Sequence, residues 1–250
     1  MTITPETPVR DIAVAIPTAI PVLERLGVDY CCGGQHTLAE ACSAHNVAPA
    51  RALEELRQLQ HEQGANIAES HWVHAPFKEL TDYIVRRHHV FTREQLKLID
   101  DLMAKVEQRH GAEHLEVFKL SKLVAVFGSE LRHHAECEEI NLFPYIAALG
   151  TSEKKDLPAP AKGSVKMPIN RMMMDHDQTG EELRTLRMLT DNYTPPADAC
   201  PTWRALYRAV EELEADLHQH IHLENNILFP RAIKQAEAEN ATIPAAACCV

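Results

Sequence analysis

Apolar residues recur at three- and four-residue steps along four long segments that begin at residue 77. In the first segment the pattern runs through Leu80, Ile84, Phe91, Leu98 and Leu102. This period places apolar side chains on one face of an α-helix. Four such helices with short or moderate connections predict an all-α protein with an up-down-up-down four-helix bundle. The predicted helices span residues 77–110, 114–148, 166–191 and 201–237.

The part of the chain before residue 77 has a different pattern, because its helical signals are short and punctuated by Pro and Thr. Thr37, followed three residues later by Glu40, predicts a capping box at the start of one short helix. Gly27 marks a probable turn. The chain is therefore expected to divide into a small helical N-terminal domain (1–62), a linker (63–76), the bundle (77–240) and a C-terminal tail (241–250).

The composition agrees with a helical globular protein and excludes several classes of function. Aromatic residues make up only 5% of the chain, which favours helices over a β-sandwich. The net charge of −11 would repel a phosphate backbone, so we expect no nucleic-acid partner. No apolar run is long enough to span a bilayer, so we expect no membrane association. The seven cysteines do not form the pattern of a secreted disulfide framework, and we expect a cytoplasmic protein with reduced thiols.

One eleven-residue phrase occurs twice within the predicted bundle. It reads HAECEEINLFP from His134 and HIHLENNILFP from His220. A shorter pattern, H-x4-E-x-L, starts at His89 and again at His176. The two patterns lie 45 residues apart in the first copy and 44 residues apart in the second. The chain therefore holds two similar helix pairs in the same order.

The spacing within the repeated phrase points two metal-binding side chains in one direction. Residues four apart lie about one turn apart on the same helix face, so His134 aligns with Glu138 and His220 with Glu224. A Leu-Phe dipeptide follows in each copy and indicates that this face reaches the core, where an ionisable group needs a partner or a metal. The proline that closes each phrase is expected to bend or end its helix.

Packing the four helices would bring four histidines and two glutamates together inside the bundle. Six nitrogen and oxygen donors suit two metal ions better than one, and a carboxylate can bridge two ions. Iron, manganese and zinc all accept this mixture of donors. The alternative is that each His–Glu pair is an ordinary helix-surface pair. The expected metal ligands are His89, His134, Glu138, His176, His220 and Glu224.

Several histidines neighbour the expected ligands but point elsewhere around their helices. They are rotated by roughly 100° or 200° from the ligand face, so we expect them to be solvated or to support the ligands. The choice of His89 over its neighbour depends on register with His176. These out-of-register residues are His88, His133, His218 and His222.

Two acidic residues lie close to the expected ligands in sequence. Glu130 is one turn before His134, and Asp175 directly precedes His176. We expect them to contact the ligands from outside the metal centre or to line a path for small molecules. The alternative is that both are solvated acids.

Five motifs together carry a family resemblance. They are VDYCCGGQHTLAEAC from Val28 to Cys42, and HHVFTRE, HAECEEINLFP, MDHDQTGEEL and HIHLENNILFP in the bundle. In these motifs the chain resembles the hemerythrin-like di-iron proteins. More closely, it is similar to the RIC family (repair of iron centres), with its ScdA and NorA-type relatives. The resemblance implies an ScdA-like N-terminal domain followed by a hemerythrin-like di-iron bundle.

The resemblance also implies a particular metal centre. Its four histidine ligands fall on His89, His134, His176 and His220, and its two carboxylates fall on Glu138 and Glu224. It implies two non-haem iron ions, bridged by the carboxylates and by an oxo or hydroxo group. Oxygen-carrying hemerythrins use five histidines. No fifth histidine is in register here, which argues against simple oxygen transport.

The function implied by the resemblance is repair of iron–sulfur clusters damaged by nitrosative or oxidative stress. The chain would donate iron, and its partners would be damaged iron–sulfur proteins. The alternative is a di-iron protein that binds or reduces nitric oxide, as a scavenger or sensor with nitric oxide or oxygen as its small ligand. Iron donation fits better than classical enzyme activity, although nitric oxide reductase activity stays open, as does the oligomeric state.

Cys31 and Cys32 are the second chemical feature of the chain. Adjacent cysteines followed by Gly33-Gly34 indicate a tight turn, where a thiolate can be stabilised. We expect these thiols to take part in redox chemistry or iron transfer. The alternative is that they are small apolar residues of a core. No role is assigned to Cys248 and Cys249 in the tail.

Overall fold

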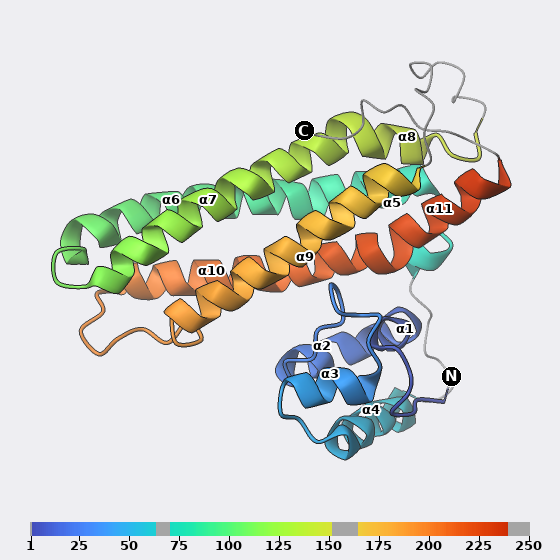
Figure 1. Cartoon of the computed structure of the whole chain (residues 1–250), viewed down its shortest axis with the longest axis horizontal. Helices are drawn as coiled ribbons and strands as arrows, with labels where there is room; N and C mark the ends of the chain where they lie inside the picture. The colour runs from blue at the N-terminus through green and yellow to red at the C-terminus, as the bar shows by residue number, and fades with distance from the viewer. Residues whose placement is uncertain (1, 64–70, 152–164, 240–250) are drawn as a thin grey trace.

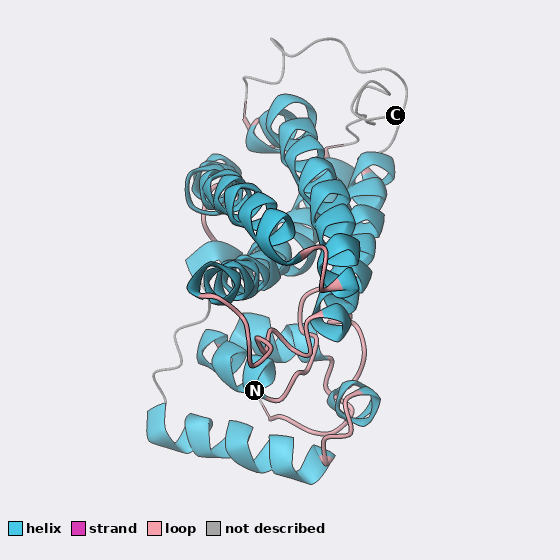
Figure 2. Cartoon of the chain, turned by 90° about the vertical axis from the view of Figure 1, so that its left-hand side faces the viewer, coloured by secondary structure: helices cyan, strands magenta, loops and turns pink. Residues whose placement is uncertain are grey.

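Helices account for all the regular structure in residues 2–63, 71–151 and 165–239, which the computed structural model describes. Within these residues the one extended pairing is an isolated bridge between Pro8 and Thr37. Four long helical rods lie side by side as a bundle, and a smaller helical domain lies against one half of it (Figure 1). Figure 2 shows the rods from one end. The predicted all-α bundle with a small helical N-terminal domain is confirmed.

Three of the four rods contain a short π-helical segment, whereas the third rod, α9 (Lys166–Leu189), is a single α-helix. The rods begin and end close to the four predicted segments. The first rod consists of α5 (Phe77–Ile84), η3 (Val85–His89) and α6 (Val90–His110). The second rod consists of α7 (Leu115–Cys137), η4 (Glu138–Leu142) and α8 (Phe143–Ala147). The fourth rod consists of α10 (Pro201–His222), η6 (Leu223–Leu228) and α11 (Phe229–Ala238).

The π segment η3 changes which face of the first rod meets the core. Leu80 and Ile84, which precede it, are buried as predicted. Leu98, which the regular period places in the core, is 46% exposed, so that prediction was wrong. The extra residue of a π turn rotates the following positions by about 100°. The buried positions after the turn are consequently Leu96, Ile99 and Met103.

Each proline was expected to bend or end its helix, and Pro144 and Pro230 do not end theirs. Each lies just after a π segment, at the first or second position of a new α-helix. A proline is tolerated there because its missing N–H is not needed for the first helical hydrogen bonds. The change from π to α geometry therefore lets both rods continue through their prolines.

Two apolar clusters fill the bundle, one toward each end. One cluster includes Phe127 and the fully buried Trp203, and the other includes Ile169 and Phe229. On each rod, the expected metal ligands fall where one cluster gives way to the other. In addition, α6 packs against α7 and α10, and α7 packs against α9. The polar centre of the bundle is thus closed on both sides by apolar packing.

The N-terminal domain has an apolar core of its own, to which the bundle contributes Ile221. The predicted capping box is present: Glu40 N donates to Thr37 Oγ1 (3.2 Å), and Thr37 N donates to Glu40 Oε2 (2.9 Å). Gly27 adopts φ +68° at the predicted turn, a conformation that favours glycine. The helices of this domain are α1 (Val9–Ala15), η1 (Pro17–Ala19), α2 (Ile20–Arg25), α3 (Leu38–Ala44) and α4 (Pro49–Gln63).

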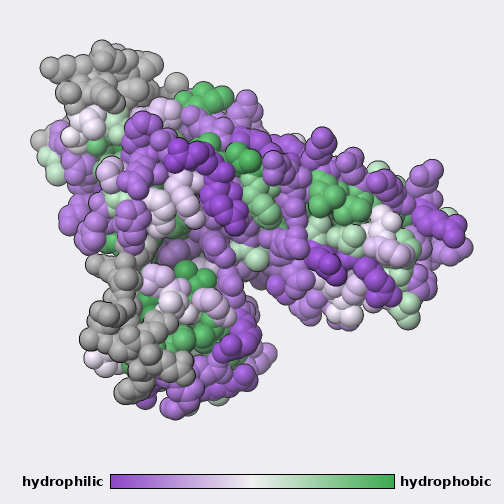
Figure 3. Space-filling view, turned by 180° about the vertical axis from the view of Figure 1, so that it is seen from behind, coloured by the Kyte–Doolittle hydropathy of each residue, from purple (hydrophilic) through white to green (hydrophobic). Residues whose placement is uncertain are grey.

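Parts of the expected linker and tail lie outside the described residues. These parts are residues 64–70 of the linker and the whole tail, which includes Cys248 and Cys249. The described end of the linker contains the 3₁₀ turn η2 (His71–Val73). The domain boundaries proposed from sequence stay a prediction. In the space-filling view the N-terminal domain forms a separate lobe, and the face of the molecule in view is largely hydrophilic (Figure 3). Among the helices that the structure describes, none has the length and apolarity to cross a membrane.

His114 forms ion pairs with two carboxylates, Glu116 and Asp198, and this clamp predicts how the stability of the bundle depends on pH. His114 Nδ1 lies 2.8 Å from Glu116 Oε1, and its Nε2 lies 3.0 Å from Asp198 Oδ2. These carboxylates, Glu116 first, raise the pKa of His114. The stabilisation should be fully present below the ordinary histidine pKa of about 6.5 and should be lost as the pH rises through the raised pKa.

We expect His114→Gln to lower the melting temperature most near pH 6, with the difference from the wild type shrinking at alkaline pH. Thermal melts at a series of pH values measure this difference. The control is His45→Gln, which removes an exposed histidine. A difference for His114→Gln that does not change with pH would contradict the clamp.

Candidate metal centre

All six expected ligands meet inside the bundle, at the junction between its two apolar clusters. Three of them belong to π segments, because His89 ends η3, Glu138 begins η4 and Glu224 lies in η6. The wider turn of a π segment often occurs where a helix must aim a functional side chain. The remaining ligands, on α7, α9 and α10, are His134, His176 and His220.

The six side chains form two groups of four donors, and the two glutamates belong to both groups. Within each group the donor atoms all lie within 4.8 Å of one another. One group is His89, Glu138, His220 and Glu224, and the other is His134, Glu138, His176 and Glu224.

Each glutamate directs one carboxylate oxygen into each group. Glu138 Oε2 lies 3.3 Å from His89 Nε2, and Glu138 Oε1 lies 3.4 Å from His134 Nε2. Glu224 Oε1 lies 2.9 Å from His220 Nε2, and Glu224 Oε2 lies 3.1 Å from His176 Nε2. Two donors bound at about 2.1 Å to one ion lie roughly 3.0 Å apart in octahedral and 3.4 Å apart in tetrahedral geometry. The observed separations therefore suit donors that share a cation.

The centre also has unsatisfied polar atoms that a cation would satisfy. Both glutamates are 0% exposed. Neither oxygen of Glu138, nor Oε2 of Glu224, accepts a hydrogen bond within the described part of the chain. Ring nitrogens also converge: the Nε2 atoms of His89 and His220 are 3.2 Å apart, and those of His134 and His176 are 3.0 Å apart. Buried carboxylates and converging imidazole nitrogens fit a pair of metal cations.

Most pKa shifts at the centre favour positive charge, the exception being His220, whose pKa is lowered by burial. Burial and the neighbouring Glu138 would raise the pKa of Glu224, but His220 and His176 lower it to about 2. Burial would lower the pKa of His134, but the charge of Glu138 and the ion pair with Asp175 raise it to about 10. The carboxylates therefore stay ionised, and protons and metal cations compete for the same imidazole nitrogens.

Hydrogen bonds to the outer ring nitrogens orient two of the four histidines toward the centre. His89 Nδ1 lies 2.7 Å from Glu139 Oε1, and His176 Nδ1 lies 2.8 Å from Asn225 Oδ1. Such partners fix the tautomer that leaves Nε2 free for a metal. Glu139 and Asn225 were not expected from the sequence. The signal that was present is their position, since each follows the glutamate of one repeated phrase.

Comparisons with known proteins agree with this centre. The family model "Hemerythrin HHE cation binding domain" matches residues 80–232, and the ScdA_N model, a domain of unknown function, matches residues 5–60. An "Iron-sulfur cluster repair protein YtfE" from Musicola paradisiaca is 38% identical, covering 92% of this chain and 97% of the relative. A "Probable iron-sulfur cluster repair protein" from Haemophilus influenzae is 37% identical, covering 90% and 96%.

The chain belongs to the hemerythrin-like family of iron–sulfur cluster repair proteins. The resemblance seen in the sequence motifs is therefore confirmed. The domain matched by the family model binds cations, and this member of the family has buried His and Glu clusters that are suited to a metal site.

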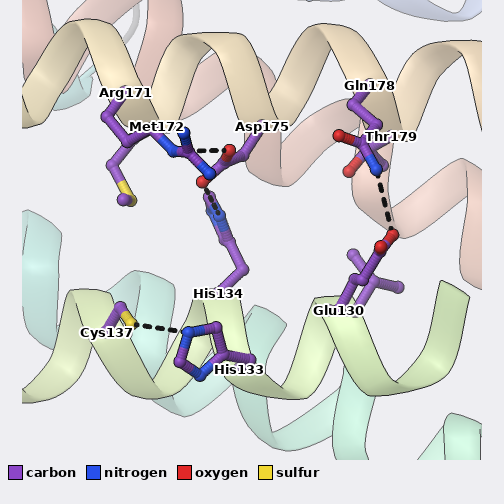
Figure 4. A pocket seen from close by; sticks show the side chains of 10 residues that line it. Glu130, His133, His134, Cys137, Arg171, Met172, Asp175, Gln178 and Thr179 are labelled. Carbon is purple, nitrogen blue, oxygen red and sulfur yellow. Dashed lines mark hydrogen bonds and ion pairs between the residues drawn. The ribbon is translucent and has the colours of Figure 1, made fainter. Parts of the chain in front are cut away.

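One side of the centre opens to a cavity of about 180 Å³ between α7 and α9 (Figure 4). His134 lines this cavity, and its side chain is 12% exposed. Asp175 Oδ2 lies 3.7 Å from His134 Nδ1, and Arg171 lies 3.1 Å from the other oxygen of Asp175. Although burial would raise the pKa of Asp175, His134 and Arg171 lower it. Asp175 thus contacts an expected ligand from outside the centre.

Glu130 lines the same cavity but takes part in a different contact. It accepts a hydrogen bond of 3.2 Å from Gln178, as Figure 4 shows. Its side chain is exposed. The structure therefore places Glu130 in the lining of this cavity rather than against an expected ligand.

Of the four histidines that were expected to be solvated or to support the ligands, two are buried and two are at least partly exposed. His88 is buried, pairs through Nδ1 with Asp216 at 3.0 Å, and stacks on His220 with ring centroids 5.5 Å apart. His222 is also buried, and burial lowers its pKa to about 4. These two are not solvated, because the N-terminal domain and the neighbouring helices cover them. His133 is exposed and His218 is partly exposed.

Cys31 and Cys32 belong to neither bundle group. They are free thiols in the loop between α2 and α3, and Cys31 is buried. This loop contacts α9, because Cys32 Sγ lies 3.3 Å from the carbonyl oxygen of His176. The cysteine motif is consequently adjacent to the backbone of an expected ligand.

A cation bound at this centre should stabilise the fold. Treating the chain with a chelator should lower its melting temperature, and adding Mn²⁺ should restore it, because Mn²⁺ prefers nitrogen and oxygen donors to thiolates. A cation at a hundred times its dissociation constant stabilises by about 2.7 kcal/mol. Calorimetry of the metal-free chain with and without Mn²⁺ measures this gain. A gain of equal size in Glu138→Ala/Glu224→Ala would show that the cation binds elsewhere.

Proposed function

We propose that the chain is a di-iron protein that repairs iron–sulfur clusters damaged by nitrosative or oxidative stress, by donating iron. The observation that carries the proposal is the position of Glu138 and Glu224, each with one oxygen in each donor group. Relatives named as iron–sulfur cluster repair proteins support the class of partner, which is a damaged iron–sulfur protein.

In this proposal the residues of the bundle hold two iron ions as a carboxylate-bridged pair. His89 and His220 would ligate one ion, His134 and His176 the other, and the glutamates would bridge them. The bound pair supplies a store of Fe²⁺ and a position open to small ligands. Nitrogen and oxygen donors hold iron less tightly than the thiolates of a cluster site do. Iron can therefore pass from the bundle to a client, meaning a damaged iron–sulfur protein, because the thiolates of the client bind iron more strongly.

The cavity beside His134 is the route by which iron would leave the bundle. Among the four histidine ligands, His134 has the most exposed side chain, at 12%. Asp175 and Glu130 line the cavity and offer carboxylate oxygens, which are ligands that Fe²⁺ accepts. Rotation of this one histidine, away from its contact with Glu138 Oε1 (3.4 Å), would open the centre to the cavity.

The same cavity supports a second function, binding or reduction of nitric oxide. Its volume of about 180 Å³ admits a diatomic molecule as far as His134. Both functions fit a cytoplasmic protein, since a reducing compartment keeps Cys31 and Cys32 as thiols. Only a measurement of turnover separates iron donation from nitric oxide reduction.

The iron content of the purified chain tests the proposed ligands. We expect about two iron ions per chain, and we expect Glu138→Ala or Glu224→Ala to remove most of them, because each change takes one donor from both groups. Iron analysis with Mössbauer spectroscopy provides the measurement. The matched control is Glu136→Ala, which removes an exposed carboxylate two residues from Glu138. Full iron content in the Glu138→Ala/Glu224→Ala variant would disprove the bridging assignment.

A reconstitution assay tests the function itself. The iron-loaded chain should reactivate an iron–sulfur enzyme damaged by nitric oxide and should lose iron as it does so. The Glu138→Ala/Glu224→Ala variant should not exceed the background without added protein. Repeated consumption of nitric oxide with an electron donor, without reactivation of the enzyme, would instead support the second function.

A further inference from the structure

The loop that carries Cys31 and Cys32 brings three metal-binding side chains together outside the bundle centre. Sγ of Cys31 lies 3.8 Å from Sγ of Cys32 and 3.5 Å from Oδ1 of Asp29. Ligand atoms from these three residues all lie within 4.8 Å of one another. Both cysteines are free.

Two of these separations match the edges of a tetrahedral metal site. A tetrahedral cation with metal–sulfur bonds of about 2.3 Å and metal–oxygen bonds of about 2.0 Å places two sulfurs about 3.8 Å apart. The same geometry places a sulfur and an oxygen about 3.5 Å apart. The sulfur pair and the Cys31–Asp29 pair match these values without any movement of the chain.

The backbone of the loop holds the three donors in position. Asp29 Oδ1 accepts hydrogen bonds from the backbone N–H groups of Cys31 (3.1 Å) and Cys32 (3.0 Å). The two glycines that follow leave the necessary room. A Cβ at Gly33 would lie 3.2 Å from Asp29 Oδ2, and a Cβ at Gly34 would lie 2.6 Å from the carbonyl oxygen of Tyr30. The Cys-Cys-Gly-Gly sequence therefore shapes a loop with preset donors.

Without a cation, negative charge on Asp29 and Cys32 opposes ionisation of the Cys31 thiol. The hydrogen bond to Cys32, burial, and the negative charges of Cys32 and Asp29 raise the pKa of Cys31 well above its usual range. The Cys31 thiol consequently keeps its proton in the metal-free chain. A divalent cation would replace two thiol protons and would offset the charge of the carboxylate.

We propose that Asp29, Cys31 and Cys32 form a third metal site, which binds one thiophilic divalent cation at the contact between the N-terminal domain and the bundle. Binding forms two metal–sulfur bonds and one metal–oxygen bond and releases two protons. No electron is transferred. The fourth position is left for water or for a ligand from another molecule.

Contacts with the bundle place this site next to the proposed iron centre. Cys32 Sγ lies 3.3 Å from the carbonyl oxygen of His176. Asn225 Nδ2 donates to the carbonyl oxygen of Cys31 (3.4 Å), and Asn225 Oδ1 lies 2.8 Å from His176 Nδ1. Asn226 Nδ2 donates to the carbonyl oxygen of Tyr30 (2.8 Å). Within the proposed function, on which this role rests, the site would hold one iron ion between the bundle and a client.

Cobalt is a suitable probe, because thiolate–Co²⁺ charge transfer absorbs in the near ultraviolet and the ligands of the bundle include no thiolate. The full chain, with its bundle loaded with iron, is titrated with Co²⁺ without oxygen and in the presence of a phosphine reductant. We expect one Co²⁺ per chain with the thiolate band, and binding that strengthens as the pH rises. Absence of the band from the wild-type chain would overturn the proposal.

Matched variants locate the band. Cys31→Ser/Cys32→Ser should abolish it, whereas Cys42→Ser, which changes a buried cysteine of the same domain, should keep it. Cys248→Ser/Cys249→Ser, which changes the other adjacent pair, should also keep the band. A band of undiminished strength in Cys31→Ser/Cys32→Ser would overturn the proposal.

Asp29→Asn gives a second test that preserves the fold of the loop, because the amide oxygen can still accept the two backbone hydrogen bonds. We expect the Co²⁺ affinity to fall at least about tenfold, since loss of even an outer partner costs that much. The control is Asp11→Asn, an exposed acid of the same domain, which should bind as the wild type does. An unchanged affinity in Asp29→Asn would remove Asp29 from the site. Failure of cobalt binding together with normal cluster repair would refute this site and leave the proposed function intact.

Discussion

The structure depends on one constraint, the complete burial of two carboxylates in the middle of a helical bundle. Glu138 and Glu224 have no exposed surface, and three of their four oxygens accept no hydrogen bond within the described residues. Removing a carboxylate from water costs several kcal/mol unless a positive charge compensates it. The four surrounding histidines can offer protons or share metal ions. The bundle is therefore organised around a centre that requires cations.

The π segments show how the helices meet this requirement. Three ligands, His89, Glu138 and Glu224, lie within π segments, and the helices resume α geometry directly afterwards. A register change at each of these points lets a helix turn a polar side chain inward and then return apolar side chains to the core. The two apolar clusters on either side then fix the positions of the polar groups, because tightly packed interiors resist movement.

The N-terminal domain contacts the proposed metal centre through a short chain of hydrogen bonds. Asn225 joins the carbonyl group of Cys31 to the outer nitrogen of His176, so the cysteine loop and a proposed metal ligand share one side chain. The loop therefore places the soft thiol donors of Cys31 and Cys32 next to the harder nitrogen and oxygen donors of the bundle. That arrangement suits a protein that passes a metal ion onward, since each donor set favours a different partner.

The amino-acid sequence by itself determined the four rods and the donor types. Helical periodicity gave the rods, and the repeated phrases gave the histidines and glutamates, because both depend on residues close together in the chain. Tertiary structure decided the rest. It buried His88 against Asp216, exposed Leu98 after a π turn, and selected Glu139 and Asn225 as partners of His89 and His176. It also placed Cys32 beside His176, 144 residues away in the chain. Such contacts depend on how helices pack and where their register shifts, which no local pattern of side chains specifies.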